Sequence, residues 1–300
     1  MSQGPANNSS PAEHGPSATE SSEPTMAWQI VEGEGPVPRG VDPTVPNVAR
    51  MYDYYLGGRD NYAADREAAD KVLSRYPELR EVCRVGREFL IELVQTLAGE
   101  GVRQFLDVGS GLPTRRNVHT VAREVAPDAR VVYADYDRVV VRHAQALLPG
   151  ERGRTAVIEA DLREPEAILG HHSTQELIDF SQPTLVLLIS VLHFIQESED
   201  PYGAVRRLMA PMAPGSYLAI VHAGGMKLPD RAHDAAIEYR QATAQMAFRD
   251  HEQVMRFFEG MEFLEPGLVP VGQWRGARAS TPELAELLAT AGLVGVARKL

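Results

Sequence analysis

The chain is poor in cysteine and has no long hydrophobic run. It has one cysteine in 300 residues, Cys83, so no internal disulfide and no cysteine cluster for zinc can form. No uninterrupted apolar run reaches the roughly 18 residues that a membrane-spanning helix needs, and no basic segment followed by a hydrophobic one stands at the N-terminus. We therefore expect a cytoplasmic protein without a membrane partner, with Cys83 at an inert helical position.

A basic stripe is also lacking. The formal net charge is −11 at pH 7, and the six acids and one base before residue 47 leave about −6 for the rest. Nucleic-acid binding depends mainly on neutralising phosphates with lysine and arginine, so the balance argues against DNA or RNA as a partner. Histidine, cysteine and acidic residues show no metal-ligand spacing, and neither a G-x-S-x-G elbow nor a Walker loop occurs. We predict no metal.

Composition divides the chain into three parts. Residues 1–46 are rich in Ser, Pro, Gly and Glu and poor in bulky apolar groups, which predicts a disordered acidic tail. Residues 47–100 carry helical signals, with a Gly-Gly break, a polar cap after it, and then an apolar stripe that stops at Gly99 and Gly101. An N-terminal helical region is predicted there, followed by an α/β domain over residues 101–300.

Short apolar runs alternate with helical patterns after residue 101. The expected strands cover residues 104–108, 130–135, 155–160, 184–190 and 216–222. Strands that are apolar on both faces and separated by helix-length connections predict a doubly wound α/β fold, with a parallel sheet between two layers of helices. A long helix is expected over about 230–258. The C-terminal segment is expected to supply two closing strands, GLVPVGQW and LVGVARKL, around the helix TPELAELLATAG.

The first expected strand runs into a glycine-rich turn. Ligands of such sheets lie beyond the carboxyl ends of the strands, and small residues such as Gly109, Ser110 and Gly111 let a ligand approach the backbone. A dinucleotide fingerprint would require a third glycine where Thr114 stands. Asp107 would oppose a pyrophosphate but would suit the ammonium of an amino acid. S-Adenosylmethionine is a ligand that brings such an ammonium.

The next two strands also end in acids. Asp135 lies 26 residues beyond Gly109, about where an acid accepts hydrogen bonds from a ribose in nucleotide-binding βαβ units. Asp161 follows the third strand, where a carboxylate can accept from the adenine amino group. Three acids at three successive strand ends form a constellation, although Asp107 alone could cap a turn and Asp135 alone could be a loop acid.

These features together resemble the class I S-adenosylmethionine-dependent methyltransferases over roughly residues 42–300. FLDVGSG, VVYADYD, EADL and LVLLISVLHFI are similar to that family's glycine loop, ribose acid, adenine acid and fourth-strand motif. More narrowly, VPNVARMYDYYLGGRDNYAADR, FLDVGSGLPTRRNVH and GVARKL resemble a bacterial S-adenosyl methyltransferase subfamily formerly catalogued as a domain of unknown function. The resemblance implies a Rossmann-like, seven-stranded, mostly parallel sheet, an N-terminal helical lid, and S-adenosyl-L-methionine as cofactor with S-adenosyl-L-homocysteine as product. It implies no substrate.

The resemblance also assigns roles to residues. The implied cofactor residues are Asp107, Gly109 and Gly111 at the methionine end, Asp135 at the ribose, Asp161 and Leu162 at adenine, and Ser190 near the sulfonium; Ser110 and Tyr136 are further implied cofactor contacts. The lid and substrate wall would include Arg50, Tyr52, Asp53, Gly58, Arg59 and Asn61. Arg50 or Arg59 could meet a carboxylate of the substrate or the cofactor. Ser190 could equally be just a small residue at a strand end.

Two histidines are candidate catalytic bases. Methyl transfer from a sulfonium is an in-line displacement that depends mainly on alignment, and a base is needed only if the nucleophile must lose a proton. His193 follows the fourth strand and His222 ends the fifth, with His193 slightly ahead. Each could equally be a hydrogen-bonded structural histidine. No Asn-Pro-Pro-Tyr-like motif follows the fourth strand, which together with the negative charge favours a small-molecule acceptor.

Two other functions stay open on the sequence. One is a regulatory module that binds S-adenosylmethionine without turnover. The other is a nicotinamide-dependent oxidoreductase, in which Thr114 would have to replace the third glycine and Asp107 would have to tolerate a pyrophosphate. The sequence indicates no particular oligomeric state.

Overall fold

The structure is a computed structural model, and it describes Met1 and residues 28–31, 35–38, 40–114, 116–147, 153–224, 245–274 and 281–300. Its helices are α1 (Val48–Tyr55), α2 (Ala63–Arg75), α3 (Leu79–Gly99), α4 (Val118–Val125), α5 (Arg138–Leu147), α6 (Pro165–Gly170), α7 (His172–Leu177), α8 (Pro201–Met209), α10 (His251–Met255) and α11 (Pro282–Ala291). Its strands are β1 (Trp28–Val31), β2 (Gly35–Pro38), β3 (Gln104–Val108), β4 (Arg130–Asp135), β5 (Thr155–Glu159), β6 (Thr184–Ile189), β7 (Tyr217–Ala223), β8 (Met261–Phe263), β9 (Val269–Pro270) and β10 (Gly292–Lys299). The 3-10 helices are η1 (Leu192–Phe194), η2 (Glu197–Glu199), η3 (Arg256–Phe258) and η4 (Val271–Gln273).

The main sheet confirms the predicted mostly parallel, doubly wound topology. Its seven-strand path runs β5-β4-β3-β6-β7-β10-β8, and the two-residue β9 pairs with β10 beside this path. Strands β5, β4, β3, β6 and β7 are parallel, whereas β10 is antiparallel to its neighbours. Strand order reverses between β3 and β6, so the carboxyl ends of these two strands border the crevice where such folds bind ligands.

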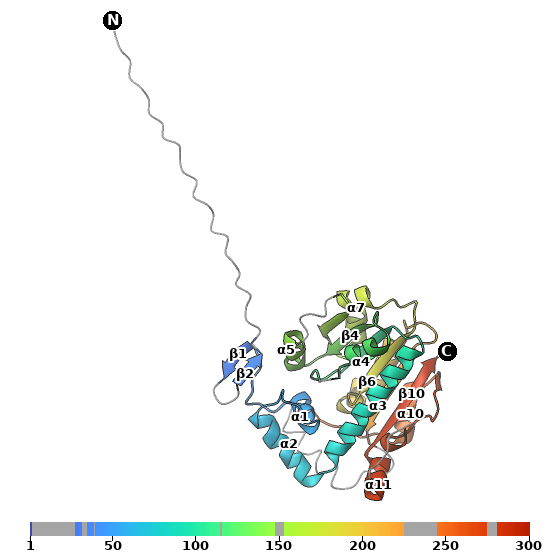
Figure 1. Cartoon of the computed structure of the whole chain (residues 1–300). Helices are drawn as coiled ribbons and strands as arrows, with labels where there is room; N and C mark the ends of the chain where they lie inside the picture. The colour runs from blue at the N-terminus through green and yellow to red at the C-terminus, as the bar shows by residue number, and fades with distance from the viewer. Residues whose placement is uncertain are drawn as a thin grey trace.

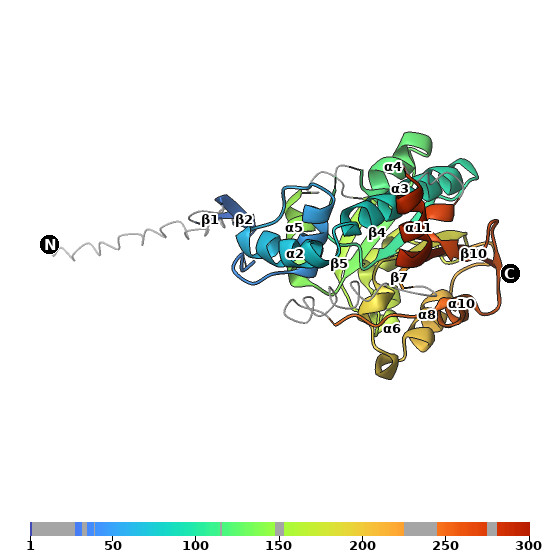
Figure 2. The same cartoon turned by 90° about the horizontal axis from the view of Figure 1, so that it is seen from below.

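Each face of the sheet has its own hydrophobic core. Side chains at alternate strand positions point to opposite faces, so Phe105 and Leu106 of β3 belong to different cores. Helices α3, α4 and α11 pack on one face and α6, α8 and α10 on the other, as Figure 2 shows. The apolar stripe of α3, which includes Phe89, Leu93 and Leu97, is buried against the first face, and this explains the four-residue spacing in the sequence.

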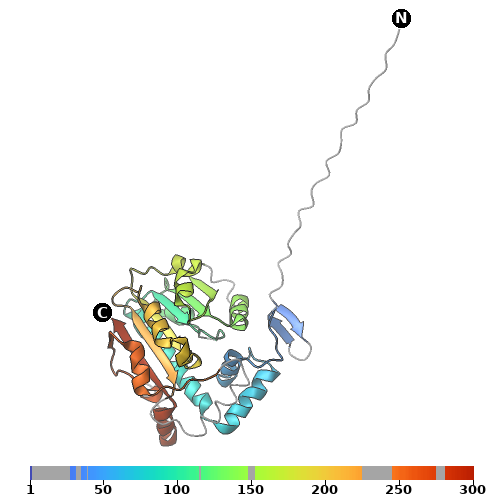
Figure 3. The same ribbon diagram turned by 180° about the vertical axis from the view of Figure 1, so that it is seen from behind.

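Helices α1 and α2 pack on each other and on α3 beyond one end of the sheet (Figures 1 and 3). Before them, β1 and β2 form an antiparallel hairpin, and Val37 and Val41 pack with Tyr62 and Val139. Two short strands therefore lie within the range of the predicted tail, residues 1–46, and its disorder stays a prediction. Four-residue strands with two prolines in the second carry too little periodic signal to be recognised in sequence.

The region after β7 differs from the long helix expected over about 230–258. Its first part, residues 230–244, lies outside the described residues, and residues 245–250 are not helical. Helix α10 begins only at His251, because the Asp250 carboxylate accepts a hydrogen bond from the Gln253 amide at 2.8 Å and caps it. The C-terminal helix and the final strand are confirmed as α11 and β10, GLVPVGQW supplies only β9, and β8 was not foreseen.

Candidate active site

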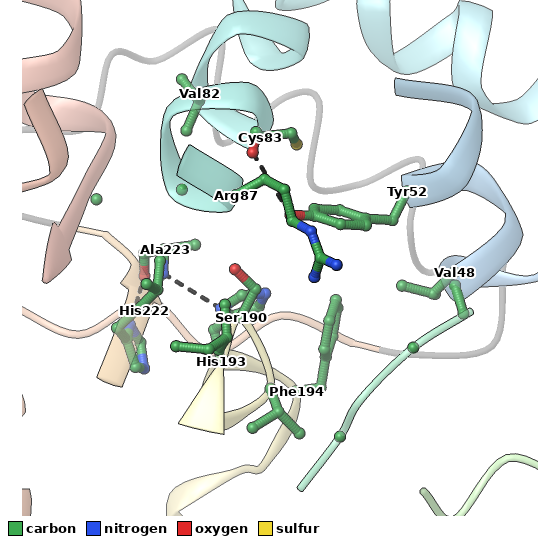
Figure 4. Close-up of a pocket in the computed structure, with 18 of the residues that line it drawn as sticks. Val48, Tyr52, Val82, Cys83, Arg87, Ser190, His193, Phe194, His222 and Ala223 are labelled. Atoms are coloured by element: carbon green, nitrogen blue, oxygen red, sulfur yellow. Dashed lines mark hydrogen bonds between the residues drawn. The ribbon is translucent and has the colours of Figure 1, made fainter. Parts of the chain in front are cut away.

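A pocket of ≈ 220 Å³ lies beyond the carboxyl ends of β3, β4, β6 and β7. The residues that end these strands line one side of it, and α1, α2 and the first half of α3 line the other. Figure 4 shows Arg87 reaching into its middle, with Tyr52 and Val48 on one side and Ser190 and His222 across from them.

The glycine turn after β3 lines this pocket with almost no side chain. Gly109 and Gly111 have φ angles of +71° and +64°, in the left-handed region that glycine tolerates best. The Gly109 amide donates to the Ala134 carbonyl at 2.8 Å, and the Gly111 amide donates to an Asp135 carboxylate oxygen at 3.0 Å. The turn is therefore tied to the end of β4 and leaves its inner surface open, as the sequence predicted.

We expect Gly109→Ala to destabilise the protein by about 2–4 kcal/mol, because it combines a strained backbone with a clash. A Cβ on Gly109 would lie 2.3 Å from Val191 Cγ2. Gly111→Ala is the matched control, since its φ is also positive but no heavy atom lies within 4 Å of the new Cβ. It should cost only about 1 kcal/mol. Urea unfolding of the ligand-free variants measures both values, and equal losses would contradict the role of the clash.

Asp107 presents a buried carboxylate to the pocket. The residue is 5% exposed, and its carboxylate has no hydrogen-bond partner among the described residues. Burial raises the pKa of Asp107 to about 7, while the Arg87 charge lowers it and Asp135 raises it further. A buried carboxylate without a donor is unfavourable unless a cation or donor from a ligand completes it. The alternative that Asp107 caps the turn finds no support in these contacts.

Asp135 both holds the turn and faces the pocket. Its two carboxylate oxygens accept from the amides of Gly111 at 3.0 Å and of Asp137 at 2.9 Å. Burial raises the pKa of Asp135 to about 6, and these backbone hydrogen bonds lower it. A carboxylate oxygen has more than one acceptor site, so Asp135 can keep these bonds and still accept from a ligand hydroxyl. Tyr136 also lines the pocket and is 48% exposed, with the Arg163 guanidinium over its ring at 5.6 Å.

Arg87 lines the pocket and was not among the site residues expected from the sequence. Its Nη2 donates to Thr114 Oγ1 at 2.6 Å and to the Arg116 carbonyl at 2.5 Å, which fixes the guanidinium beside the glycine turn. Its other nitrogens have no hydrogen-bond partner among the described residues, so they can serve a ligand. One feature of the sequence could have identified Arg87: it lies on α3, on the same helical face as Cys83 and Leu90.

Ser190 ends β6 in an unusual backbone conformation. Its φ is +60°, and its amide donates to the Val221 carbonyl at 2.9 Å. A non-glycine residue held in this region costs on the order of 1–3 kcal/mol, and such residues cluster at functional sites. Ser190 lines the pocket, as expected, and the strained turn directs the chain into η1, which carries His193 and Phe194.

His193 and His222 differ in whether both ring nitrogens have hydrogen-bond partners. His193 Nδ1 accepts from the Ala223 amide at 3.2 Å, whereas its Nε2 has no hydrogen-bond partner among the described residues. His222 is engaged at both nitrogens, because Nδ1 lies 2.6 Å from the Ala223 carbonyl and Arg249 donates to Nε2 at 3.1 Å. Burial and then the Arg249 charge lower the pKa of His222 to about 3. His222 therefore fits the structural alternative, and His193 keeps one nitrogen for chemistry.

Comparison with known proteins decides among the chemistries that this pocket allows. The family model described as S-adenosyl methyltransferase matches residues 35–300. The chain belongs to that family. The matched range makes it an S-adenosylmethionine-dependent methyltransferase, so the oxidoreductase alternative has no support. The matched range starts at residue 35 and so includes β2.

Two solved structures are similar to this methyltransferase over most of their length. A DUF574 family protein from Streptomyces avermitilis MA-4680 is 38% identical, with a TM-score of 0.79, over 86% of this chain and 99% of the other. A candidate methyltransferase from Thermobifida fusca YX is 40% identical, also with a TM-score of 0.79, over 87% and 98%. No curated protein matches the chain. The predicted resemblance and the seven-stranded sheet are thereby confirmed.

The pocket of this methyltransferase fits its cofactor. The methionine end of S-adenosylmethionine carries an ammonium and a carboxylate, and the pocket offers the unpartnered Asp107 carboxylate and the free nitrogens of Arg87. The two residues expected at adenine lie outside this pocket. Asp161 and Leu162 do not line the pocket, and the Asp161 carboxylate is held by the Arg163 guanidinium with Nε at 2.9 Å from both oxygens. Their contact with adenine stays a prediction.

Of the six lid residues named from the sequence, only Tyr52 lines the pocket. Tyr52 Oη donates to the Cys83 carbonyl at 3.5 Å. Arg59 is exposed, and Arg50 is fully buried elsewhere, so neither meets a ligand carboxylate in this arrangement. Among the described residues, the arginine that lines the pocket is Arg87. Cys83 also lines the pocket, and burial raises the pKa of its thiol to about 12, which agrees with an inert residue.

The remaining lid residues hold the α1–α2 turn together. The Asp53 carboxylate accepts from the Asp60 amide at 2.9 Å and from Asn61 Nδ2 at 2.8 Å. Gly58 passes so close that a Cβ there would lie 1.9 Å from Asp53 Oδ1. The G-G-R-D-N pattern is therefore explained by the geometry of this turn. Asp53, Gly58 and Asn61 do not line the pocket, and their place in a substrate wall stays a prediction.

The segment of residues 245–250 also lines the pocket, which was not expected from the sequence. Residues 245–250 run past η1, and Met246 and Phe248 line the pocket. Arg249, 2% exposed, donates to the carbonyls of Leu192 at 2.9 Å and Ile195 at 2.8 Å. This arginine fixes η1 and the segment to each other. Within the described part of the chain there is no helix able to cross a membrane and no cluster of potential metal ligands.

Proposed function

We propose that this methyltransferase transfers the methyl group of S-adenosylmethionine to a small-molecule acceptor in the pocket described above. The observation that carries the proposal is the Asp107 carboxylate, which is buried, faces the pocket and has no hydrogen-bond partner among the described residues. Arg87 stands beside it with free donors. A ligand end with adjacent ammonium and carboxylate groups matches this pair of charges.

Individual residues take the following roles in this proposal. Asp107 accepts from the ammonium, and Arg87 donates to the carboxylate of the methionine end. Asp135 accepts from the ribose hydroxyls while it keeps Gly111 in place. Tyr136 borders the adenosine, and Ser190 lies near the sulfonium. Helices α1 and α2 act as a lid that keeps water from the reacting groups.

The reaction depends mainly on aligning the acceptor, the methyl group and the sulfur. The cofactor supplies a methyl group bonded to a positively charged sulfur. The acceptor's lone pair forms the new bond to this carbon, and the electrons of the breaking carbon–sulfur bond return to sulfur. Where the acceptor is a hydroxyl, its proton passes to His193 Nε2. Burial, followed by His222 and Arg249, holds the pKa of His193 well below its usual value, so the ring is neutral at pH 7 with a free lone pair on Nε2, and it is a weaker base than an exposed imidazole. Positioning supplies on the order of 7–11 kcal/mol in the best cases.

Asp135→Ala is expected to weaken S-adenosylmethionine binding by about 1.5–3 kcal/mol, or roughly 10- to 150-fold, because a charge-assisted hydrogen bond to the ribose is lost. Calorimetric titration of both proteins measures the effect. Asp128→Ala, an exposed acid outside the pocket, serves as control and should bind like the wild type. An unchanged affinity in Asp135→Ala would remove the ribose assignment.

The test of the reaction uses S-adenosylmethionine with a labelled methyl group and a metabolite extract. Mass spectrometry should find one labelled metabolite with the wild type and none with Asp107→Asn. Binding without any labelled product would favour a regulatory module instead. The single cysteine and the acidic surface favour a cytoplasmic setting, so the extract is best taken from the soluble contents of the source cell.

A further inference from the structure

The face of helix α3 that lines the pocket has one position without a side chain, Gly86. Leu79, Cys83 and Leu90 line the pocket from this face, and between them stands Gly86, which is buried in the middle of a 21-residue helix. Glycine lowers helix stability relative to alanine, so an interior glycine normally answers a need for space or for an unusual backbone angle.

The fold itself does not need this glycine. A Cβ on Gly86 would find Val221 Cγ1 at 3.8 Å, which is ordinary van der Waals contact, and no other heavy atom within 4 Å. Its backbone is helical. Alanine would therefore fit, and a longer side chain would have only the pocket to enter. The space in front of Gly86 is part of the ligand-binding volume.

This space adjoins a strand end near which the methyl group is expected. The carbonyl of Val221, the neighbour of Gly86, accepts a hydrogen bond from the Ser190 amide at 2.9 Å, and His193 comes three residues after Ser190, within η1. The glycine turn with Asp107 lies on the same side of the pocket. A group that fills the space at Gly86 is therefore next to the strand ends that hold the cofactor's reactive part.

Much of the rest of the pocket is lined by apolar and aromatic side chains. Tyr52, Val48 and Phe194 lie together on the side that Figure 4 shows beside Arg87, and Met246 and Phe248 complete them. Among the described residues, the acids that line the pocket are Asp107, Asp135 and Asp137, which lie at or just after strand ends, so no described residue on the lid side offers a carboxylate to a cation. Tyr52 adds no negative charge, because burial raises the pKa of its phenol. Such walls favour ligands that bury apolar surface and disfavour ammonium groups.

We propose that the lid side of the pocket binds an apolar acceptor with an aromatic ring system and no positive charge, and that Gly86 provides the space through which its reactive group reaches the cofactor. The inference rests on the proposed methyl transfer. It adds the acceptor's chemical class and a residue that determines specificity by its lack of a side chain.

The test uses an aromatic anionic dye, 8-anilinonaphthalene-1-sulfonate, with protein saturated by S-adenosylhomocysteine. Wild type should bind one dye molecule, and Gly86→Leu should weaken dye binding at least about tenfold because leucine fills the space. Gly99→Leu is the matched control, since Gly99 lies on the same helix with its nearest side chain also at 3.8 Å but outside the pocket. Dye binding to this control should equal that of the wild type. Equal binding by Gly86→Leu, or no binding by wild type, would overturn the proposal.

Two further measurements separate this proposal from the one on which it rests. Val48→Trp places a large side chain in the same pocket from α1 and should also weaken dye binding, which covers the case in which Gly86→Leu folds poorly. Gly86→Ala should raise the unfolding temperature by about 1–3 °C, as helix propensity requires. S-Adenosylhomocysteine should bind all of these variants within about threefold of wild type. If wild type fails to bind it, the proposed function fails; if it binds but the dye result is absent, only the acceptor proposal fails.

Discussion

Asp107→Asn is expected to weaken S-adenosylhomocysteine binding by about 3–5 kcal/mol, several hundred-fold or more, because it leaves a buried ammonium without its counter-charge. The ligand-free variant should be as stable as wild type or more so, since burial disfavours the ionised carboxylate that is removed. Calorimetric titration and thermal unfolding measure the two effects. Unchanged binding together with lower stability would show that Asp107 is a structural cap.

The wild-type affinity should also depend on pH. Asp107 has a raised pKa of about 7, so the ligand-free protein holds a proton there below pH 7. Binding of an ammonium requires the ionised form, so this proton must leave. Affinity should therefore rise with pH, and between pH 5 and pH 7.5 the change amounts to nearly 10²-fold from this group alone. Asp135, with its pKa raised to about 6, acts in the same direction.

Arg50→Met should lower the free energy of unfolding by about 3–5 kcal/mol, because it leaves the buried Asp65 carboxylate without its partner. The two side chains are fully buried, with Arg50 Nε 2.7 Å from Asp65 Oδ2. Asp65 also accepts from the amides of Asn47 and Tyr62 at 2.8 Å each, so the pair joins both ends of the α1–α2 unit. Urea unfolding gives the value directly.

The control for Arg50 is an arginine in exposed ion pairs. Arg84 pairs with Glu81 and Glu88 on the surface of α3, and its side chain is 46% exposed. Arg84→Met should therefore change stability by less than about 1 kcal/mol. Combining Arg50→Met with Asp65→Leu should recover part of the loss, because no unpaired charge is left behind. Equal losses in Arg50→Met and Arg84→Met would contradict the role of burial.

The sequence predicted the sheet well because its strands are apolar on both faces. Strands β3 and β4 have the expected bounds, and the ends of β5, β6 and β7 differ by one residue. The acids Asp107 and Asp135 could be found in the same way, since the end of a buried parallel strand fixes where its next side chains lie. The segment after β7 defied prediction because Asp250 caps a helix inside a stretch with continuous helical composition.

The lid was predicted as a region but not in detail. Its pattern of Arg50, Asp53, Gly58 and Asn61 looked functional, yet these residues hold α1 and α2 together through buried contacts. The sequence alone does not distinguish residues that pack α1 against α2 from residues that bind a ligand. Arg87 and Phe248 escaped notice for the opposite reason, because each reaches the pocket from a segment whose position depends on tertiary packing.

Proton release on ligand binding tests the central claim most directly. Calorimetric titration with S-adenosylhomocysteine at pH 6, in buffers of different ionisation enthalpy, gives the number of protons exchanged. With a pKa of about 7 at Asp107, roughly 0.9 proton or more should leave per ligand bound, and Asp107→Asn should lose that release. Binding to wild type without proton release, or no binding at all, would contradict the claim that Asp107 holds the amino-acid end of the cofactor.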